Sequence, residues 1–291
     1  MADHPPERSL DLPPAAHQAI QDLSVDATGP VKLLISGGIG TGKTTVLSAA
    51  RGMLSREGLT VLTRPPRPGD PPDAALIVDD AHLLTGEELV SLTERAADHR
   101  ATVVVAAEPW ENMRNLAVAI ERDRPRISLG PLPVAGDLLH YTAGLPFLVH
   151  AVGVSGAQSA ARTAQFTLID RLRRLDEPTL DALLVTSLAR ELGTADVAAA
   201  LDISATDARR LVDRAHASGL VAQSHGPEFM ASVHDAVALI VGNAHHREVE
   251  TVLLRSQFDM STVSPEFALR LAEHGLRDDR LAAVLARQAG A

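Results

Sequence analysis

Short apolar runs alternate with amphipathic segments through the first 130 residues of the chain. We expect strands where the runs lie, over residues 31–36, 59–63, 74–80, 101–107 and 126–129. Between them, apolar residues recur at three- and four-residue spacing, which predicts helices over residues 42–56, 86–99 and 109–123. Strands that alternate with helices are typical of a parallel sheet covered on both faces. The pattern predicts an α/β fold with a five-stranded parallel sheet.

The pattern changes after residue 132. Residues 135–217 read almost entirely as helices. Residues 220–235 then alternate between apolar and polar side chains, which predicts a small β-hairpin with its turn at Gly226-Pro227. Helices followed by such a hairpin outline a winged helix. Residues 236–291 are helical again, and residues 267–291 resemble one helix pair of an α-solenoid.

Two proline-rich segments interrupt this order. Residues 1–13 are polar and predicted to be loose, ahead of a short helix that starts at Pro14. Residues 63–74 hold five prolines, which predicts an exposed loop. The length of 291 residues is too great for one small core, so we expect at least two compact units.

Composition narrows the class of protein. The formal net charge is −10 and aromatic residues make up only 2% of the chain, which argues against a broad electrostatic or stacking surface for nucleic acid. The absence of cysteine excludes disulfides and thiolate-bound zinc and fits a reducing compartment. No apolar run is long enough to span a membrane, and the first residues lack the layout of a secretory signal. We expect a soluble, cytoplasmic protein.

A glycine-rich loop lies between the first strand and the first long helix, in the sequence GGIGTGKT. Gly37, Gly42, Lys43 and Thr44 satisfy the pattern G-x-x-x-x-G-K-[ST]. In that pattern backbone N–H groups surround phosphate oxygens, and the helix N-terminus favours the anion. We therefore expect ATP or ADP to bind at Gly37, Gly38, Ile39, Gly40, Thr41, Gly42, Lys43, Thr44 and Thr45.

Four side chains near this loop are assigned chemical roles. Lys43, one of two lysines in the chain, is expected to contact the β- and γ-phosphates, and the Thr44 hydroxyl to ligate Mg²⁺. The apolar run LIV ends in Asp79, where a carboxylate can hold Mg²⁺ through water. Asp80 is then placed to orient an attacking water. The predicted catalytic residues are Lys43 and Asp80, and the predicted metal ligands are Thr44 and Asp79.

These residues resemble the signal-transducing ATPases with numerous domains, the STAND class of AAA-like P-loop ATPases, and within it the ATPase and winged-helix region of large LuxR-type transcriptional regulators. LIVDDAHLL resembles their DDAHW signature, with Leu83 in place of tryptophan. RISLGPLP, residues 126–133, resembles the segment that closes the sheet, and GLPFLV, residues 144–149, resembles the G-x-P motif. The resemblance implies that Pro146 packs over the nucleotide base and that the winged helix acts as a switch arm.

The chain departs from that family in two places. Only residues 133–143 separate the sheet from the G-x-P motif, where the family has a longer helical lid. Ala106, Ala107 and Glu108 end the fourth strand, where family members often carry a polar or arginine sensor. Arg114 is a candidate substitute, although an arginine on an amphipathic helix is more often solvated. We therefore expect slow hydrolysis.

Several other residues have side chains that are capable of a chemical role. His82 is expected either to contact the phosphate side of the site or to cap the following helix. His234 and the pair His245-His246 are expected at a surface or interface, because the chain lacks cysteine and no other ligands follow a metal-binding spacing. Lys32 is expected to be a solvated strand flank, and Trp110 to pack at a helix start.

Residues 196–221 have the outline of a helix-turn-helix. Arg209, Arg210 and Arg214 on its second helix are the candidate DNA contacts. Residues 168–225 contain seven Arg or Lys against nine Asp or Glu, so this region is slightly acidic. We therefore prefer docking on a protein domain to direct DNA binding.

The sequence leads to the prediction of a nucleotide-dependent signalling switch with slow ATP hydrolysis, regulating transcription or a partner protein. Its expected partners are a protein or an output domain on another segment, with nucleotide-dependent oligomerisation and no membrane. Three alternatives stay open: a DNA-dependent ATPase of the helicase-loader type, an interaction module that holds ADP without turnover, and a small-molecule kinase. The predicted segments are an N-terminal tail and helix (1–29), a P-loop NTPase core (30–132), a short helical lid (133–165), a winged helix (166–235) and a C-terminal helical segment (236–291).

Overall fold

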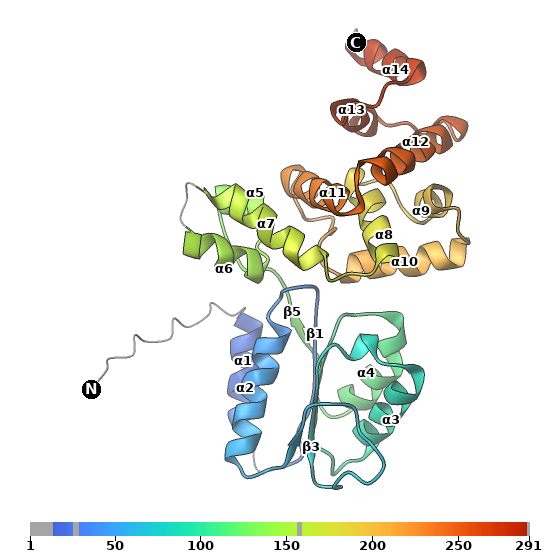
Figure 1. Cartoon of the computed structure of the whole chain (residues 1–291). Coiled ribbons are helices and arrows are strands. Elements are labelled where there is room, and N and C mark those ends of the chain that lie inside the picture. The colour runs from blue at the N-terminus through green and yellow to red at the C-terminus, as the bar shows by residue number, and fades with distance from the viewer. Residues whose placement is uncertain (1–13, 26–28, 156–158, 290–291) are drawn as a thin grey trace. The chain divides into compact units, whose positions relative to one another are not determined.

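The structure is a computed structural model that describes residues 14–25, 29–155 and 159–289 (Figure 1). The chain divides into two compact units. The first unit runs to Ala135 and includes Gly144–Val154, and the second consists of Gly136–Ala143 and the chain from Ser155 onward. The expected lid, residues 133–165, is thus divided between the two units. The segment expected to be loose, residues 1–13, lies outside the described residues.

The first unit is built on the predicted five-stranded sheet. Every strand pairing is parallel, in the order β2-β3-β4-β1-β5. In register, Lys32 lies opposite Val103, and Ile35 lies opposite Ile127. The strands are β1 (Lys32–Gly37), β2 (Val61–Leu62), β3 (Ala75–Val78), β4 (Val103–Ala107) and β5 (Ile127–Leu129). Because β1, β3 and β4 are buried along their whole length, they carry the continuous apolar runs seen in the sequence.

Helices cover both faces of this sheet, and Figure 1 shows α1 and α2 on one side and α3 and α4 on the other. Leu33, Ile35 and Val104 pack with the α1 and α2 side, whereas Leu34 and Val105 pack with the α3 and α4 side. The helices of this unit are α1 (Pro14–Val25), α2 (Lys43–Arg56), α3 (Gly86–Ala97), α4 (Arg114–Glu121) and α6 (Pro146–Ser155), with the short 3₁₀ turns η1 (Ala81–Leu83) and η2 (Glu111–Met113). The α/β fold class and the five-stranded parallel sheet are therefore confirmed.

The described part of the second unit consists of helices. They are α5 (Asp137–Thr142), α7 (Ala160–Leu172), α8 (Glu177–Leu188), α9 (Thr194–Leu201), α10 (Ala205–Ala217), α11 (Pro227–Val241), α12 (Asn243–Asp259), α13 (Pro265–Glu273) and α14 (Asp279–Ala289). Helix α8 is buried along most of its length and packs against α10 and α11. Its apolar side chains form the centre of this unit.

The predicted hairpin over residues 220–235 is wrong. Gly226 is the N-cap of α11 and Pro227 occupies its first turn, where the missing N–H of proline is harmless. From there Phe229, Val233 and Val237 recur at helical spacing and are fully or almost fully buried. The helices expected around a helix-turn-helix are present as α9 and α10, but the described residues contain no wing strand after them.

Across the described ranges, no helix combines the length and the apolar character that crossing a bilayer requires.

Candidate functional site

The glycine-rich loop joins the end of β1 to the start of α2, as the sequence pattern requires. Gly40 has φ +69° and Gly42 has φ +98°, a left-handed backbone that glycine adopts without a steric penalty. Gly42 is the N-cap of α2, and no side chain caps the helix there. The N-terminus of a 14-residue helix therefore opens onto the loop, in the arrangement that favours a bound anion.

Lys43 is folded over the same loop. Its side-chain Nζ donates to the carbonyl oxygens of Gly37 and Gly38, each at 2.8 Å, and the residue is only 7% exposed. The Thr41 hydroxyl also donates to Gly38 O, at 2.9 Å. The single lysine of the loop is thus held by backbone oxygens at the point where the sequence pattern places phosphate.

The side chains of Thr44 and Asp79 are hydrogen-bonded at the carboxyl ends of the strands. The Thr44 hydroxyl donates to Asp79 Oδ2 at 2.7 Å, although the two residues are 35 positions apart in the chain. Asp79 follows the buried strand β3, and Thr44 lies in the first turn of α2. A hydroxyl oxygen and a carboxylate oxygen that converge in this way are suitable ligands for Mg²⁺. The structure brings together the two residues that the sequence assigned to the metal.

Two glycines of the loop are closely packed. A Cβ on Gly37 would lie 2.6 Å from the Thr41 hydroxyl oxygen and 2.8 Å from Leu129 O. A Cβ on Gly40 would lie 2.2 Å from the ring of Phe147, which directly follows Pro146. Since Phe147 belongs to α6 within the first unit, the G-x-P segment lies directly against the glycine loop.

A second contact ties the G-x-P segment to the end of the sheet. The Leu132 N–H donates to Gly144 O at 2.6 Å. Gly144 has φ +73°, and a Cβ there would lie 2.5 Å from Leu132 O. The glycine of the motif is therefore required by close backbone packing, and the segments at residues 126–133 and 144–149 lie side by side.

Asp80, the predicted water-orienting residue, is exposed and has φ +46°. Its backbone N–H donates to Asp79 Oδ1 at 2.9 Å, so Asp79 is held by both Thr44 and Asp80. Aspartate tolerates the left-handed conformation better than most residues. The turn after β3 thus fixes the orientation of the Asp79 carboxylate.

A buried polar group at the end of β4 joins His82 to Glu108, an acid to which the sequence assigned no role. Glu108 is 8% exposed and His82 is 5% exposed. The Glu108 backbone N–H donates to His82 Nδ1 at 3.2 Å, and Trp110 Nε1 donates to Glu108 Oε2 at 3.1 Å. The His82 and Trp110 rings meet edge to face, with centroids 4.5 Å apart. His82 therefore packs with Glu108, while α3 is capped by Thr85 instead.

Sheet order explains why Glu108 belongs to the site. Strand β4 lies between β3 and β1, so the residue after β4 lies between the ends of the strands that carry Asp79 and the glycine loop. The sequence signal was a single acid directly after the apolar run VVVAA. That signal is weak alone, because the strand order is what gives Glu108 its position.

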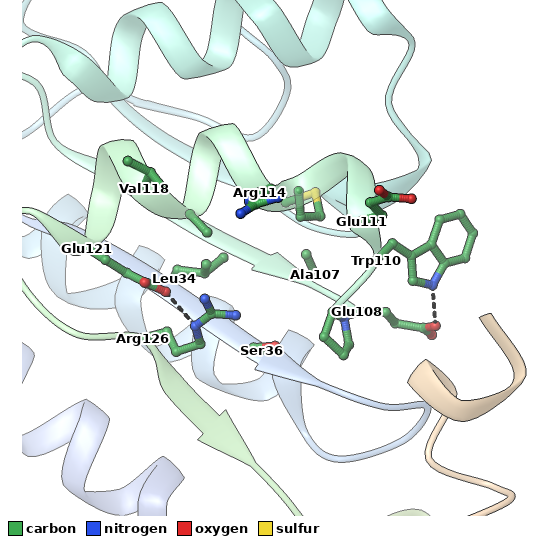
Figure 2. Close-up of a pocket in the computed structure, with 13 residues that line it drawn as sticks. Leu34, Ser36, Ala107, Glu108, Trp110, Glu111, Arg114, Val118, Glu121 and Arg126 are labelled. Atoms are coloured by element: carbon green, nitrogen blue, oxygen red, sulfur yellow. Dashed lines mark hydrogen bonds and ion pairs between the residues drawn. The ribbon is translucent and has the colours of Figure 1, made fainter. Parts of the chain in front are cut away.

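A pocket of about 380 Å³ opens on the α4 side of the sheet and includes Ser36, which directly precedes Gly37. Figure 2 shows Glu108 and Trp110 at one end of this pocket and the ion pair of Arg126 with Glu121 at the other. Arg114 lies at the start of α4, is exposed and also lines the pocket. The pocket thus carries charges of both signs next to the glycine loop.

Two expectations about individual residues are corrected. Lys32 is 7% exposed and its Nζ lies 2.6 Å from Asp123 Oδ2, so it is a buried ion-pair residue and not a solvated flank. His234 is 1% exposed in the core of the second unit, so it is not a surface histidine. Its Nε2 lies 3.0 Å from His246 Nε2. The adjacent His245 has a different partner, Asp181, so the two neighbouring histidines do not act as a pair. The sequence could not show these partners, because each depends on tertiary packing.

The candidate DNA-contacting arginines lie on α10 in the second unit. Arg210 pairs with Asp207 at 3.2 Å, and Arg214 pairs with Asp176 at 3.4 Å. Arg209 is exposed on the same helix. Two of the three positive charges are therefore balanced locally.

Comparison with protein-family models gave no match, and comparison with curated proteins also gave none.

Proposed function

We propose that this protein is a nucleotide-dependent switch that binds ATP or ADP with Mg²⁺ and hydrolyses ATP slowly. The observation that carries this proposal is the 2.7 Å contact between the Thr44 hydroxyl and Asp79. It joins the end of the glycine loop, after β1, to the acid after β3, on the far side of β4, and the two side chains bring their oxygen atoms together. A glycine-rich turn with a purely structural role does not need this pairing.

The residues at the site fit a nucleotide with its metal. The loop from Gly37 to Thr45 would hold the phosphates through backbone N–H groups, and Lys43 would exchange a backbone oxygen for a phosphate oxygen. Thr44 and Asp79 would hold Mg²⁺. The bound nucleotide supplies a phosphoanhydride that water can cleave. In the same arrangement Pro146 and Phe147, beside Gly40, would lie near the nucleotide.

Two carboxylates compete for the role of orienting the attacking water. Asp80 is exposed and adjoins the metal ligand Asp79. Glu108 is buried and held by Trp110, which gives it a fixed position between the same strand ends. A fixed carboxylate near the phosphate end can orient water without reorganisation. Glu108 thus joins Asp80 as a candidate catalytic residue.

Nucleotide binding is tested first with a fluorescent ATP analogue, with and without Mg²⁺. Because Lys43 is expected to form charge-assisted hydrogen bonds, Lys43→Ala should weaken binding by about 100-fold or more. Thr44→Val should remove the gain in affinity that Mg²⁺ provides while leaving Mg²⁺-free binding nearly unchanged. Arg51→Ala, which removes an exposed charge from the same helix, is the matched control. Equal affinities for Lys43→Ala and Arg51→Ala would refute the nucleotide site.

Turnover is tested separately, by single-turnover phosphate release from Mg-ATP. Loss of turnover in Asp80→Asn alone assigns the water to Asp80, and loss in Glu108→Gln alone assigns it to Glu108. Bound ADP without any turnover in the unaltered protein identifies the non-hydrolysing interaction module. Stimulation by added DNA identifies the DNA-dependent ATPase instead. The paired arginines of α10 and the acidic balance of the chain support a protein partner over DNA.

A further inference from the structure

A cluster of three histidines and one glutamate lies in the second unit. His234, His246, Glu250 and His274 each offer one nitrogen or oxygen atom, and these four atoms all lie within 4.8 Å of one another. His234 and Glu250 are 1% exposed, and the side chains of His246 and His274 are 13% and 15% exposed. Four potential ligand atoms therefore converge at the edge of a helical core.

The fold gathers this cluster from three helices. His234 lies on α11, His246 and Glu250 lie on α12, and His274 is the C-cap of α13. The four-residue spacing of His246 and Glu250 puts both on one face of α12. Helix α12 begins immediately after Gly242, whose φ of +88° lets the chain turn sharply at the end of α11. The cluster thus links residues up to 40 positions apart, so no short sequence motif predicts it.

The second nitrogen of His234 fixes its orientation. His234 Nδ1 lies 3.0 Å from the carbonyl oxygen of Leu184 on α8. A carbonyl only accepts hydrogen bonds, so Nδ1 carries the hydrogen and Nε2 presents a lone pair to the cluster. Metal-binding histidines characteristically donate their other ring N–H to a carbonyl or carboxylate in this way.

The cluster places one ring nitrogen, His246 Nε2, against two acceptors, while His274 Nδ1 lies 2.5 Å from Glu250 Oε1 and can donate to the carboxylate as well. His246 Nε2 lies 3.0 Å from the lone pair of His234 Nε2 and 3.1 Å from Glu250 Oε1. One ring nitrogen carries at most one hydrogen, so it cannot make a full hydrogen bond to both acceptors. A cation that takes the place of the His246 hydrogen would bind the lone pairs of His234 Nε2 and His246 Nε2 and the Glu250 carboxylate at once.

The short separations in the cluster suit a small divalent cation, and the wider ones, up to 4.8 Å, would close around it. Tetrahedral zinc with bonds of about 2.0–2.1 Å places its ligand atoms roughly 3.3 Å apart. The two contacts of His246, at 3.0 and 3.1 Å, are close to that value, and the His274 Nδ1 to Glu250 Oε1 contact at 2.5 Å would lengthen. Three imidazole nitrogens and one carboxylate oxygen are ligands of the type that zinc selects.

We infer that His234, His246, Glu250 and His274 form a binding site for one divalent transition-metal ion, with zinc as the preferred ion. Four protein ligands close the coordination shell, so the ion is structural and clips α11, α12 and α13 together. The two partly exposed histidines provide the route by which the ion enters.

The test uses the full chain without a histidine tag, stripped with a chelator and free of nucleotide. Zinc is titrated in competition with a chromophoric chelator, and Co²⁺ is added separately to record its visible spectrum. We expect one Zn²⁺ per chain, a rise in melting temperature, and the intense visible bands of tetrahedral Co²⁺. Glu250→Gln and His274→Ala should each weaken zinc binding by about 100-fold or more, as expected for loss of a ligand.

His245→Ala is the matched control. His245 adjoins His246 in the sequence, but its Nε2 bonds Asp181 Oδ1 at 2.8 Å, outside the cluster. Equal zinc affinity in wild type, His245→Ala and His274→Ala would overturn the proposal. So would a pale octahedral Co²⁺ spectrum in the folded wild type, a readout that holds even where a variant fails to fold. Neither result depends on the glycine loop in the first unit.

Discussion

Gly40→Ala is expected to destabilise the first unit through two separate effects. Gly40 has φ +69°, a conformation that disfavours alanine by about 1 kcal/mol. In addition, the new Cβ would lie 2.2 Å from the Phe147 ring, far inside van der Waals contact. Overpacking of this kind typically costs about 1–3 kcal/mol. The sum is a loss of about 2–4 kcal/mol in the free energy of unfolding.

A double-mutant cycle separates the two effects. Phe147 is half-buried, so Phe147→Ala alone should cost about 2 kcal/mol, below the range for a fully buried phenylalanine. In that background the clash with the ring is removed and only the Cβ of residue 147, 3.0 Å from the new Cβ, stays close, so Gly40→Ala should cost little more than the backbone penalty of about 1 kcal/mol. We therefore expect a coupling energy of about 2 kcal/mol between the two sites.

Urea unfolding followed by tryptophan fluorescence measures these values. Trp110 is the only tryptophan in the chain and lies in the first unit, so its signal reports that unit. Gly52→Ala is the control, because Gly52 is exposed within α2 and its Cβ would meet nothing within 4 Å. It should stabilise the unit by about 0.5–1 kcal/mol. If Gly40→Ala costs the same with and without the Phe147 ring, then the G-x-P segment does not pack on the loop.

Three further predictions concern single interactions. The hydrogen bond from Arg64 lowers the pKa of Asp70 from 3.8 to about 2, so the stabilisation from this pair is present above pH 3.8 and lost as pH falls through 2. Carboxyl NMR titration should return the Asp70 pKa toward 3.8 in Arg64→Gln, and an unchanged value would contradict this cause. Ser204→Ala removes the side chain that accepts from the Asp207 N–H at the start of α10, and should cost about 1 kcal/mol by calorimetry. Asp123→Asn removes the negative partner of the buried Lys32 ammonium and should destabilise by about 1 kcal/mol, because the Asp123 side chain is 55% exposed and solvent screens the pair, whereas Lys32→Met should be nearly neutral in the same urea assay.

The sheet could be predicted because each strand carries its own signal. Strands β1, β3 and β4 are buried on both faces, so β3 and β4 appear in the sequence as unbroken apolar runs and β1 as the run LLI between Lys32 and Ser36. The order of the strands could not be predicted in this way. Only the order shows that Glu108, after β4, lies between the two strand ends that carry the phosphate and metal residues.

The second unit was harder to predict because one pattern had two interpretations. Residues 220–235 alternate over short stretches, and Gly226-Pro227 is typical of a turn. The same dipeptide also suits a helix start, with glycine as N-cap and proline in the first turn. The longer spacing of Phe229, Val233 and Val237 favoured a helix, and a window of 15 residues would have shown it.

The two candidate sites differ in how far they could be predicted. The glycine-rich loop is continuous from Gly37 to Thr45, so its place between β1 and α2 depends on local sequence and could be predicted. Its partner Asp79 is distant, but the end of an apolar run marked it. No local sequence pattern predicts the histidine cluster, because His234, His246 and His274 converge only through the packing of three helices.

The path of the chain offers a physical route for the proposed switch. The segment that contacts the glycine loop, Gly144–Val154, belongs to the first unit, but the chain on each side of it belongs to the second. The chain therefore passes between the units on both sides of Phe147, the residue whose ring lies against Gly40. A ligand that enters the loop and displaces Phe147 would act on the first turn of α6, and α6 continues covalently into the second unit at Ser155. A nucleotide can shift the second unit between two conformations only if it interacts differently with α6 in each of them. Variants of Phe147 are therefore expected to bind nucleotide but to lose the conformational response of the second unit.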